Sequence, residues 1–378
     1  MPSKFDTSPG QRFRLEQWEP LLQQRGVEIT YAPFEDDELH AVLYQAGSTR
    51  QKLRLVARAF QRRLSLLRSV RDYDLVYVFR EASLLGPPVF ERLIHRTGVP
   101  LIFDFDDAIF VPYVSPANPY LSWLKQASKT RTICRLASHV MAGNFYLAEY
   151  AGAVNSHVTI VPTTIDTEKY YLSEQRKTAE PPVIVWSGSF STVQHLDTLR
   201  KVLQRLAKQE NFRLRVIGTP NYKLEGVEVE SMSWRAQTEV QDLGTADIGI
   251  MPLPDDRWSK GKCGLKALQY MALGIPTICS PVGVNSEIIQ DGQNGMIACT
   301  EDEWIARFTQ LLRSPELRNT LGQAGRKTVE TKYSAVVQAP RVFAIFDSVC
   351  RGLETIDEQS VSKSNAVPSR GWQRRTDS

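Results

Sequence analysis

Short apolar runs alternate along the chain with longer segments in which apolar residues recur at helical intervals. After Gly10, residues 11–26 carry apolar side chains at helical intervals, and 27–32 form a short β-branched run. Four further apolar runs occur at 75–80, 100–105, 139–143 and 158–163. Helical segments separate them, among them VFERLIHR and a stretch from YLSWLKQ to about Leu136. Strands separated in this way predict a parallel sheet covered by helices on both faces.

A second alternation begins after residues 173–182, a polar stretch ending in two prolines that we interpret as a linker. Its predicted strands are 183–188, 212–218, 246–253 and 276–281. Its predicted helices are 192–208, 263–273 and several more up to about Arg351. The chain is thus expected to form two α/β domains, 1–172 and 183–331. The polar residues 353–378 are expected to be a disordered tail.

One helical segment, residues 50–71, departs from this pattern because it carries eight basic side chains and no acidic one. Its apolar residues fall on one helical stripe: Leu53, Val56, Ala57, Phe60, Leu64 and Leu67. The stripe can pack on the protein core, as in an ordinary surface helix. It can equally rest on an anionic membrane surface, which would bring the protein to a lipid-linked partner. The sequence leaves both interpretations open.

Composition narrows the class of protein. The 378 residues include 46 basic and 42 acidic side chains, a formal charge of +4, which does not indicate a nucleic-acid partner. The five cysteines are scattered, without a pair spaced for a metal or redox site. Neither a membrane-spanning run nor a signal peptide is apparent. These features predict a cytoplasmic protein, with peripheral attachment to the inner face of the membrane if the basic helix binds lipid.

Parallel sheets bind ligands beyond the carboxyl ends of their strands, so we searched the turns that follow each predicted strand. Gly188 and Ser189 end the strand 183–188 and lead into a helix. Glycine permits close backbone approach, and the free amides at a helix start favour a phosphate. The same residues are also typical of an ordinary tight turn.

A second turn, within SKGKCGLKALQ, places Lys262 just before a predicted helix and Lys266 in its first turn. Cations are disfavoured at the positive end of a helix dipole, so an anionic ligand would resolve the conflict. Lys266 and Gln269 are three residues apart and share a face, so one could meet a phosphate and the other a sugar hydroxyl. The alternative is that the lysines are simply solvated.

Two candidates lie in the first half of the chain. Asp104, Asp106 and Asp107 end the strand 100–105 in the segment FDFDDAIF. Asp104-x-Asp106 resembles a metal-binding pair, but strand alternation favours Asp104 facing a covered side and Asp106 and Asp107 emerging at the sheet edge. We therefore expect acceptor binding or capping rather than a metal. SPGQRFR, a glycine turn followed by Arg12 and Arg14, resembles an anion-binding loop or a frayed terminus.

Taken together, these segments resemble glycosyltransferase family 4, retaining enzymes of GT-B architecture. The resemblance rests on ADIGIMPL, GKCGLKALQYMALGIPTICSPVG and EIIQDGQNG in the second half. In the first half it rests on SPGQRFR, FREASLLGPP, FDFDDAIF, MAGNFYLAEYA and IVPTTID. It implies two Rossmann-like domains whose parallel sheets face each other across a cleft, with a final helix at about 332–352 crossing back to the first domain.

The chain differs from this family in two places. Where the family has two glutamates eight residues apart, this sequence has Gly261 and Gln269. The family also begins with a buried strand, for which MPSKFDT is too polar, so we expect either that the start of the chain is missing or that the first domain lacks its central strand.

The resemblance implies transfer of a sugar, with retention, from a UDP- or GDP-linked donor to a polysaccharide or lipid-linked glycan, without metal or another cofactor. The leaving diphosphate itself would help to take the acceptor proton, so the protein mainly stabilises negative charge. The implied catalytic residues are Asp106, Asp107, Lys262 and Lys266. The implied donor residues are Gly188, Ser189, Lys262, Lys266, Gln269, for the ribose, and Glu287, for the donor loop. The implied acceptor residues are Arg12, Arg80 and Asn144.

Glu287 and Asn144 are explained equally well as helix caps. Two other functions stay open: a sugar-nucleotide-binding protein without transfer, and a nucleotide-sugar epimerase of the same architecture.

Overall fold

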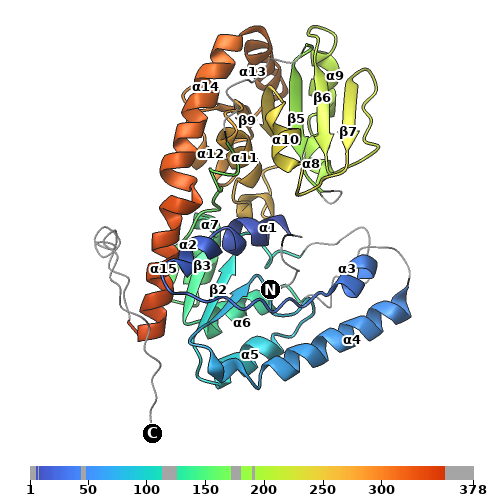
Figure 1. The fold of residues 1–378 in the computed structure, drawn as a ribbon. Coiled ribbons are helices and arrows are strands. Elements are labelled where there is room, and N and C mark those ends of the chain that lie inside the picture. The colour runs from blue at the N-terminus through green and yellow to red at the C-terminus, as the bar shows by residue number, and fades with distance from the viewer. Residues whose placement is uncertain are drawn as a thin grey trace.

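The computed structural model describes residues 6, 8–43, 48–112, 126–171, 180–189 and 192–353. Two α/β domains lie one above the other, each built around a parallel sheet, and the helices of residues 315–351 form a column that runs beside both (Figure 1). The alternation of apolar runs and helices therefore predicts the fold class correctly.

The N-terminal sheet has four parallel strands in sequence order. They are β1 (Val76–Phe79), β2 (Leu101–Phe105), β3 (His139–Ala142) and β4 (Val158–Ile160). The connecting helices are α5 (Val89–Arg96), α6 (Lys129–Leu136) and α7 (Phe145–Gly152). Before β1 come α1 (Pro9–Gln11), the π-helical η1 (Arg12–Glu16), α2 (Glu19–Gln23), α3 (Asp37–Leu43), α4 (Thr49–Leu66) and the short η2 (Val70–Asp72). All four strands match predicted runs.

The C-terminal sheet has six parallel strands in the order β10-β9-β8-β5-β6-β7. They are β5 (Val183–Ser187), β6 (Arg213–Ile217), β7 (Glu228–Met232), β8 (Ile248–Met251), β9 (Thr277–Cys279) and β10 (Met296–Ile297). Its helices are α8 (Val193–Asp197), α9 (Arg200–Leu206), α10 (Glu239–Gly244), η4 (Ser259–Gly261), α11 (Leu265–Ala272), α12 (Asn285–Ile288), α13 (Glu301–Arg313) and α14 (Pro315–Thr328). The strand order reverses beside β5, the place where open sheets of this kind bind ligands.

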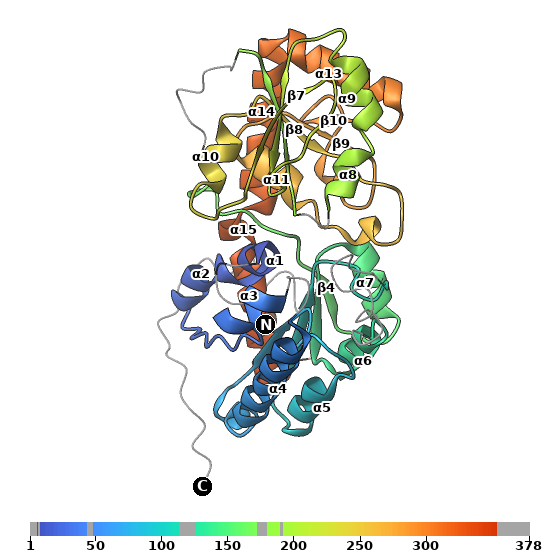
Figure 2. The same cartoon turned by 90° about the vertical axis from the view of Figure 1, so that its right-hand side faces the viewer.

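The chain returns to the N-terminal domain after α14. The π-helical η5 (Val329–Tyr333) leads into α15 (Ala335–Arg351). Val342, Ile345 and Phe346 of α15 join one buried cluster with Ile102 of β2 and Met141 of β3. The C-terminal helix thus completes the core of the N-terminal domain (Figures 1 and 2).

The predicted strand at 27–32 is wrong. These residues pair with no strand of the described sheets. Val27 and Ile29 instead pack against the cluster that includes α15, and Glu28 between them is exposed. An extended segment that rests on a helix shows the same alternation as a half-buried strand, and this explains the error.

The sequence did not predict β7 or β10. β7 is an edge strand, and its Glu228 and Glu230 form ion pairs at 2.6 and 2.9 Å with Arg213 and Arg215 of β6. Charged residues on an edge strand hide its apolar alternation and discourage pairing with other chains. β10 has only two residues, too few to show a pattern.

Several predictions fall on residues outside the described part of the chain. They concern most of the linker, 172–179, the start of the helix before Leu136, the tail 354–378 and the first five residues, where the family has its first strand.

Candidate functional site

The turn before α11 inserts against the N-terminal domain. Gly261, which stands where the family has a glutamate, lies against the backbone of Ala108, and a Cβ there would be only 2.6 Å from the Ala108 nitrogen. Gly264 begins α11 with φ +70°, a left-handed conformation natural to glycine, and offers no side-chain cap. The first amides of α11 therefore remain open to a ligand.

Four charged groups from the two domains meet at this turn. The Lys262 ammonium lies 2.7 Å from Asp107 Oδ1. Arg80 contacts Asp106 at 2.6 Å and Asp107 at 2.8 Å. Burial would raise the pKa of Asp107, but Lys262 and Arg80 outweigh it, so this pKa lies below its usual value and the carboxylate is charged. The structure thus brings Asp106, Asp107, Arg80 and Lys262 into one site, and their catalytic and binding roles stay predictions.

Arg80 reaches this site through an unusual backbone conformation. Its φ is +58°, in the left-handed region that few non-glycine residues adopt. Its amide donates to Asp104 O at 2.7 Å, which fixes the turn at the end of β1. Strain of this kind is found most often at functional sites, where it aims a side chain.

Lys266, the second residue of α11, lies in the same region. Its Nζ is 5.6 Å from the centre of the Trp186 ring, a cation–π contact. Among the described residues its ammonium has no hydrogen-bond or ion-pair partner. Burial and the neighbouring charge of Lys262, partly offset by Asp107, lower the pKa of Lys266 to about 8. The site therefore contains a cation that, within the described residues, makes no direct ion pair, although the charge of Asp107 is near.

His195 of α8 belongs to this region and was not predicted. It is buried, and burial together with the charges of Lys266 and Lys262 lowers its pKa to about 4. At neutral pH its imidazole is uncharged, so it can donate or accept a hydrogen bond without adding charge. It lies in the helix that the Gly188 turn leads into, but a single histidine inside a helix carries no motif that marks it as a site residue.

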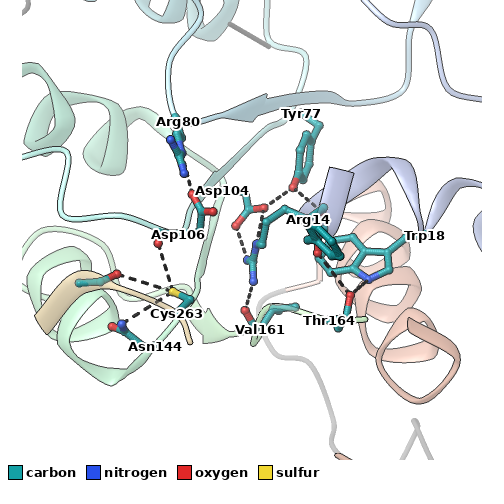
Figure 3. A network of polar contacts seen from close by, with 12 residues as sticks. Arg14, Trp18, Tyr77, Arg80, Asp104, Asp106, Asn144, Val161, Thr164 and Cys263 are labelled. Carbon is teal, nitrogen blue, oxygen red and sulfur yellow. Dashed lines mark hydrogen bonds and ion pairs between the residues drawn. The ribbon is translucent and has the colours of Figure 1, made fainter. Parts of the chain in front are cut away.

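Asn144 joins the two domains. Its Oδ1 accepts from the Leu147 amide at 2.9 Å and caps α7. Its Nδ2 donates to the carbonyl oxygens of Lys260 at 3.2 Å and Lys262 at 3.1 Å. Figure 3 shows Asn144 and the Asp106 carbonyl approaching Cys263 from two sides. One side chain thus fixes the lysine turn against the N-terminal domain, and its predicted acceptor role stays a prediction.

The fit at this junction leaves no room for a larger residue at Gly143. A Cβ there would overlap Sγ of Cys263. We expect Gly143→Ala to lower the free energy of unfolding by about 1–3 kcal/mol, as overpacking does. Gly152→Ala, where a Cβ meets nothing within 4 Å, is the matched control and is expected to be neutral or slightly stabilising. Chemical denaturation measures both, and equal stability of the two variants would contradict this fit.

A second contact between the domains is centred on the buried carboxylate of Glu239. Arg12 donates to its Oε2 from both terminal nitrogens at 3.0 Å, and Tyr170 donates at 2.6 Å. Its Oε1 accepts from Trp234 at 2.8 Å and from Gln269 at 3.1 Å. The sequence did not predict Glu239, which lies in a polar segment without a turn motif.

This cluster uses two of the predicted ligand residues. Gln269 Nε2 donates to both Tyr170 and Glu239, at 3.0 and 3.1 Å, and the side chain is buried. Arg12 is likewise turned toward Glu239 rather than open solvent. The roles of Gln269 as a ribose ligand and of Arg12 as an acceptor residue stay predictions.

The remaining predicted residues are Gly188, Ser189 and Glu287. Gly188 follows β5, and a Cβ there would meet the Trp186 ring at 2.5 Å and Thr192 Oγ1 at 2.7 Å. Ser189 faces Thr192 across the same turn. Glu287 of α12 borders a cavity of about 260 Å³ between the domains, together with Asn144, Tyr333 and Gln338. The Oε1 atom of Gln338 is buried and has no hydrogen-bond partner in the described part of the chain.

Asp104 lies behind the site, in the covered position predicted for it. It forms a fully buried ion pair with Arg14 and accepts a hydrogen bond from Tyr77, while Arg14 also donates to the Val161 carbonyl (Figure 3). Burial raises the pKa of Asp104 even though Arg14 opposes the shift. Arg14 therefore has a structural role rather than the anion-binding role that SPGQRFR suggested. Within the described ranges, no group of three or more His, Cys, Asp or Glu residues could hold a metal ion.

Known proteins resemble the part of the chain that forms the C-terminal side of this site. Residues 181–314 match the family model described as Glycosyl transferases group 1. We refer to residues 181–314, the part of the chain that matches this model, as the group 1 domain. This group 1 domain contains the Gly188 turn, His195, the lysine turn, α11 and Glu287.

A short segment also resembles EpsD of Bacillus subtilis (strain 168), a protein assigned as a glycosyltransferase. The identity is 40% over 67 residues, which cover 17% of this chain and 18% of EpsD. The chain therefore matches less than a fifth of that relative's length.

Solved structures resemble the whole two-domain arrangement. HepE of Anabaena, in complex with UDP and glucose, has a TM-score of 0.60 at 14% identity, covering 87% of this chain and 89% of HepE. Sucrose-phosphate synthase of Thermosynechococcus elongatus has a TM-score of 0.59 at 14% identity, covering 87% and 82%. The group 1 domain thus forms the second half of a GT-B fold, as the sequence resemblance implied.

Proposed function

We propose that this protein is a glycosyltransferase whose group 1 domain binds a nucleotide-sugar donor at the start of α11. The observation that carries the proposal is the Lys266 ammonium, which has a lowered pKa, lies beside Lys262 and lacks an anionic partner among the described residues. Three sources of positive potential converge there: Lys262, Lys266 and the uncapped N-terminus of α11. A diphosphate supplies the missing negative charge.

The chemistry assigned to this site is stabilisation of the leaving nucleoside diphosphate. Lys266 and the first amides of α11 would stabilise the negative charge of the diphosphate. The backbone of the turn at Gly188 and Ser189 would approach the diphosphate from the other side. Lys262 is shared with Asp107, so it would link the donor to the N-terminal domain. Such a site supplies positive charge from the protein itself, which supports transfer without a metal.

For the acceptor we propose a glycan, either a polysaccharide or a lipid-linked one, entering the cavity beside Asn144. Hydroxyl, carboxylate and amide groups from Tyr333, Glu287 and Gln338 line this cavity. The unpartnered Oε1 of Gln338 offers an acceptor for a sugar hydroxyl. Retention of the anomeric configuration belongs to the same proposal and rests on the resemblance to glycosyltransferase family 4.

A panel of UDP, GDP, ADP and inorganic pyrophosphate tests the donor site. We expect UDP or GDP to raise the melting temperature of the full chain more than pyrophosphate does, because ligands that bind the folded state stabilise it. The HepE complexes make UDP the first ligand to try.

Incubating the protein with UDP-glucose or GDP-mannose and a glycan extract then separates the possible functions. Labelled glycan is the expected product, and NMR of its anomeric proton reports retention. Binding without turnover would favour a sugar-nucleotide-binding protein. Conversion of the donor without any acceptor would favour an epimerase. No thermal shift with any nucleotide would reject the donor site.

A further inference from the structure

Helix α4 presents an apolar strip to solvent. Leu55 and Ala59 face inward and are buried, whereas Leu53 is 65% exposed and Leu64 is 49% exposed. Ala57 lies between these leucines on the outward face. The apolar stripe expected from the sequence is therefore divided: Val56, Phe60 and Leu67 are half-buried against neighbouring residues, and the other members point outward.

Some arginines of α4 contact the protein, and others are exposed to solvent. Arg62 pairs with Asp36 and donates to the Phe34 carbonyl at 3.0 Å, and Arg63 donates to Ala32 O at 2.8 Å. These two hold the segment before α3 in place. Arg50 and Arg54 are exposed and have no ion-pair or hydrogen-bond partner within the part of the chain that the structure describes.

Apolar exposure is concentrated around this helix. Of the ten large apolar side chains that are exposed among the described residues, five lie between positions 53 and 89: Leu53, Leu64, Leu66, Tyr73 and Val89. Both views show α4 and α5 on the part of the N-terminal domain that faces away from the C-terminal domain (Figures 1 and 2). No helix in the described ranges is long and apolar enough to cross a bilayer. Any membrane contact there would be at the surface.

We propose that the outward face of α4, formed by Arg50, Leu53, Arg54, Ala57 and Leu64, binds the surface of an anionic lipid bilayer. α4 carries six basic residues and no acidic one, so its charge complements that of acidic headgroups. A nucleic acid or an acidic protein surface would use the arginines but would leave the leucines in water. The interface of a bilayer accepts both, because leucines enter the acyl boundary while arginines stay among the headgroups.

The test is sedimentation of the full chain with vesicles of phosphatidylcholine alone or with 30% phosphatidylglycerol. We expect binding to the anionic vesicles only, weakened by raising the salt concentration. Arg50→Gln with Arg54→Gln is expected to lower the partition coefficient roughly 30-fold. Leu53→Ser with Leu64→Ser is expected to lower it roughly tenfold. Lys201→Gln with Lys208→Gln on the C-terminal domain, two exposed lysines, is the charge-matched control and should bind like the wild type.

Three results would overturn the proposal. Equal sedimentation with neutral and anionic vesicles removes the role of charge. Equal loss in the Arg50/Arg54 variant and in the Lys201/Lys208 control shows a diffuse electrostatic effect. Unchanged binding of the Leu53/Leu64 variant, together with equally tight binding of duplex DNA, indicates a polyanion site instead. Melting temperatures of all variants, measured first, show whether each is folded, and the substituted side chains are exposed enough for folding to be retained.

Discussion

Replacing Lys266 by methionine is expected to weaken the binding of a nucleoside diphosphate by roughly 10- to 100-fold, the usual effect of losing one charge-assisted hydrogen bond. The same change is expected to make the ligand-free protein more stable at pH 7, because it removes a cation that burial and Lys262 both disfavour. Calorimetry with UDP or GDP measures the first effect and thermal unfolding the second.

The stability difference between the wild type and the Lys266 variant should depend on pH, because the pKa of Lys266 is lowered. Between about pH 8 and the ordinary lysine value of 10.5, the unfolded chain holds a proton that the folded chain has released. The contribution of Lys266 to stability therefore rises with pH in that window, and the advantage of the methionine variant should shrink. Lys201→Met, on the exposed face of α9, is the control and should change neither quantity. Unaltered nucleotide affinity in the Lys266 variant would remove the donor site from α11.

Replacing Arg14 by methionine is expected to lower the free energy of unfolding by about 3–5 kcal/mol, because it leaves the buried charge of Asp104 without its counter-ion. Combining it with Asp104→Asn should recover much of the loss, since a neutral amide still accepts from Tyr77. Urea denaturation of the two variants measures the difference. If the double variant is as unstable as the single one, lost contacts of Arg14 other than the ion pair are responsible.

Acid should partly rescue the Arg14 variant. Without Arg14, the pKa of Asp104 should rise further above its usual value, because Arg14 lowers it in the native protein. Protonation of Asp104 then removes the uncompensated charge, so the loss of stability should be smaller at pH 5 than at pH 8. Arg200→Met breaks an exposed pair with Asp197 and should cost less than about 1 kcal/mol at either pH.

The fold could be predicted from the sequence wherever a strand is buried on both faces. β2 and β5 are mostly apolar and buried along their whole length, and helical spacing on either side leaves few alternatives. Segment 27–32 could not be assigned correctly, because packing on α15 depends on residues some 300 positions later in the chain. β7 was missed for a different reason, since its charged side chains are paired with β6.

The site likewise contains residues that a local sequence pattern predicts and residues that only tertiary packing brings there. Asp106, Asp107, Arg80 and Lys262 were predictable because each follows a strand or precedes a helix at the cleft. Glu239 and His195 were not predictable, because neither position carries a turn or spacing signal. The contacts of Gln269 with Tyr170 and Glu239 likewise arise from tertiary packing across the chain and have no local pattern.

The position of α15 has a consequence for how the protein is made. Ile102 and Met141 are covered by Val342, Ile345 and Phe346, which are synthesised much later in the chain. The N-terminal half therefore emerges first, and part of its sheet stays uncovered until these residues of α15 have also been synthesised. During that interval it presents an apolar surface that a chaperone could protect.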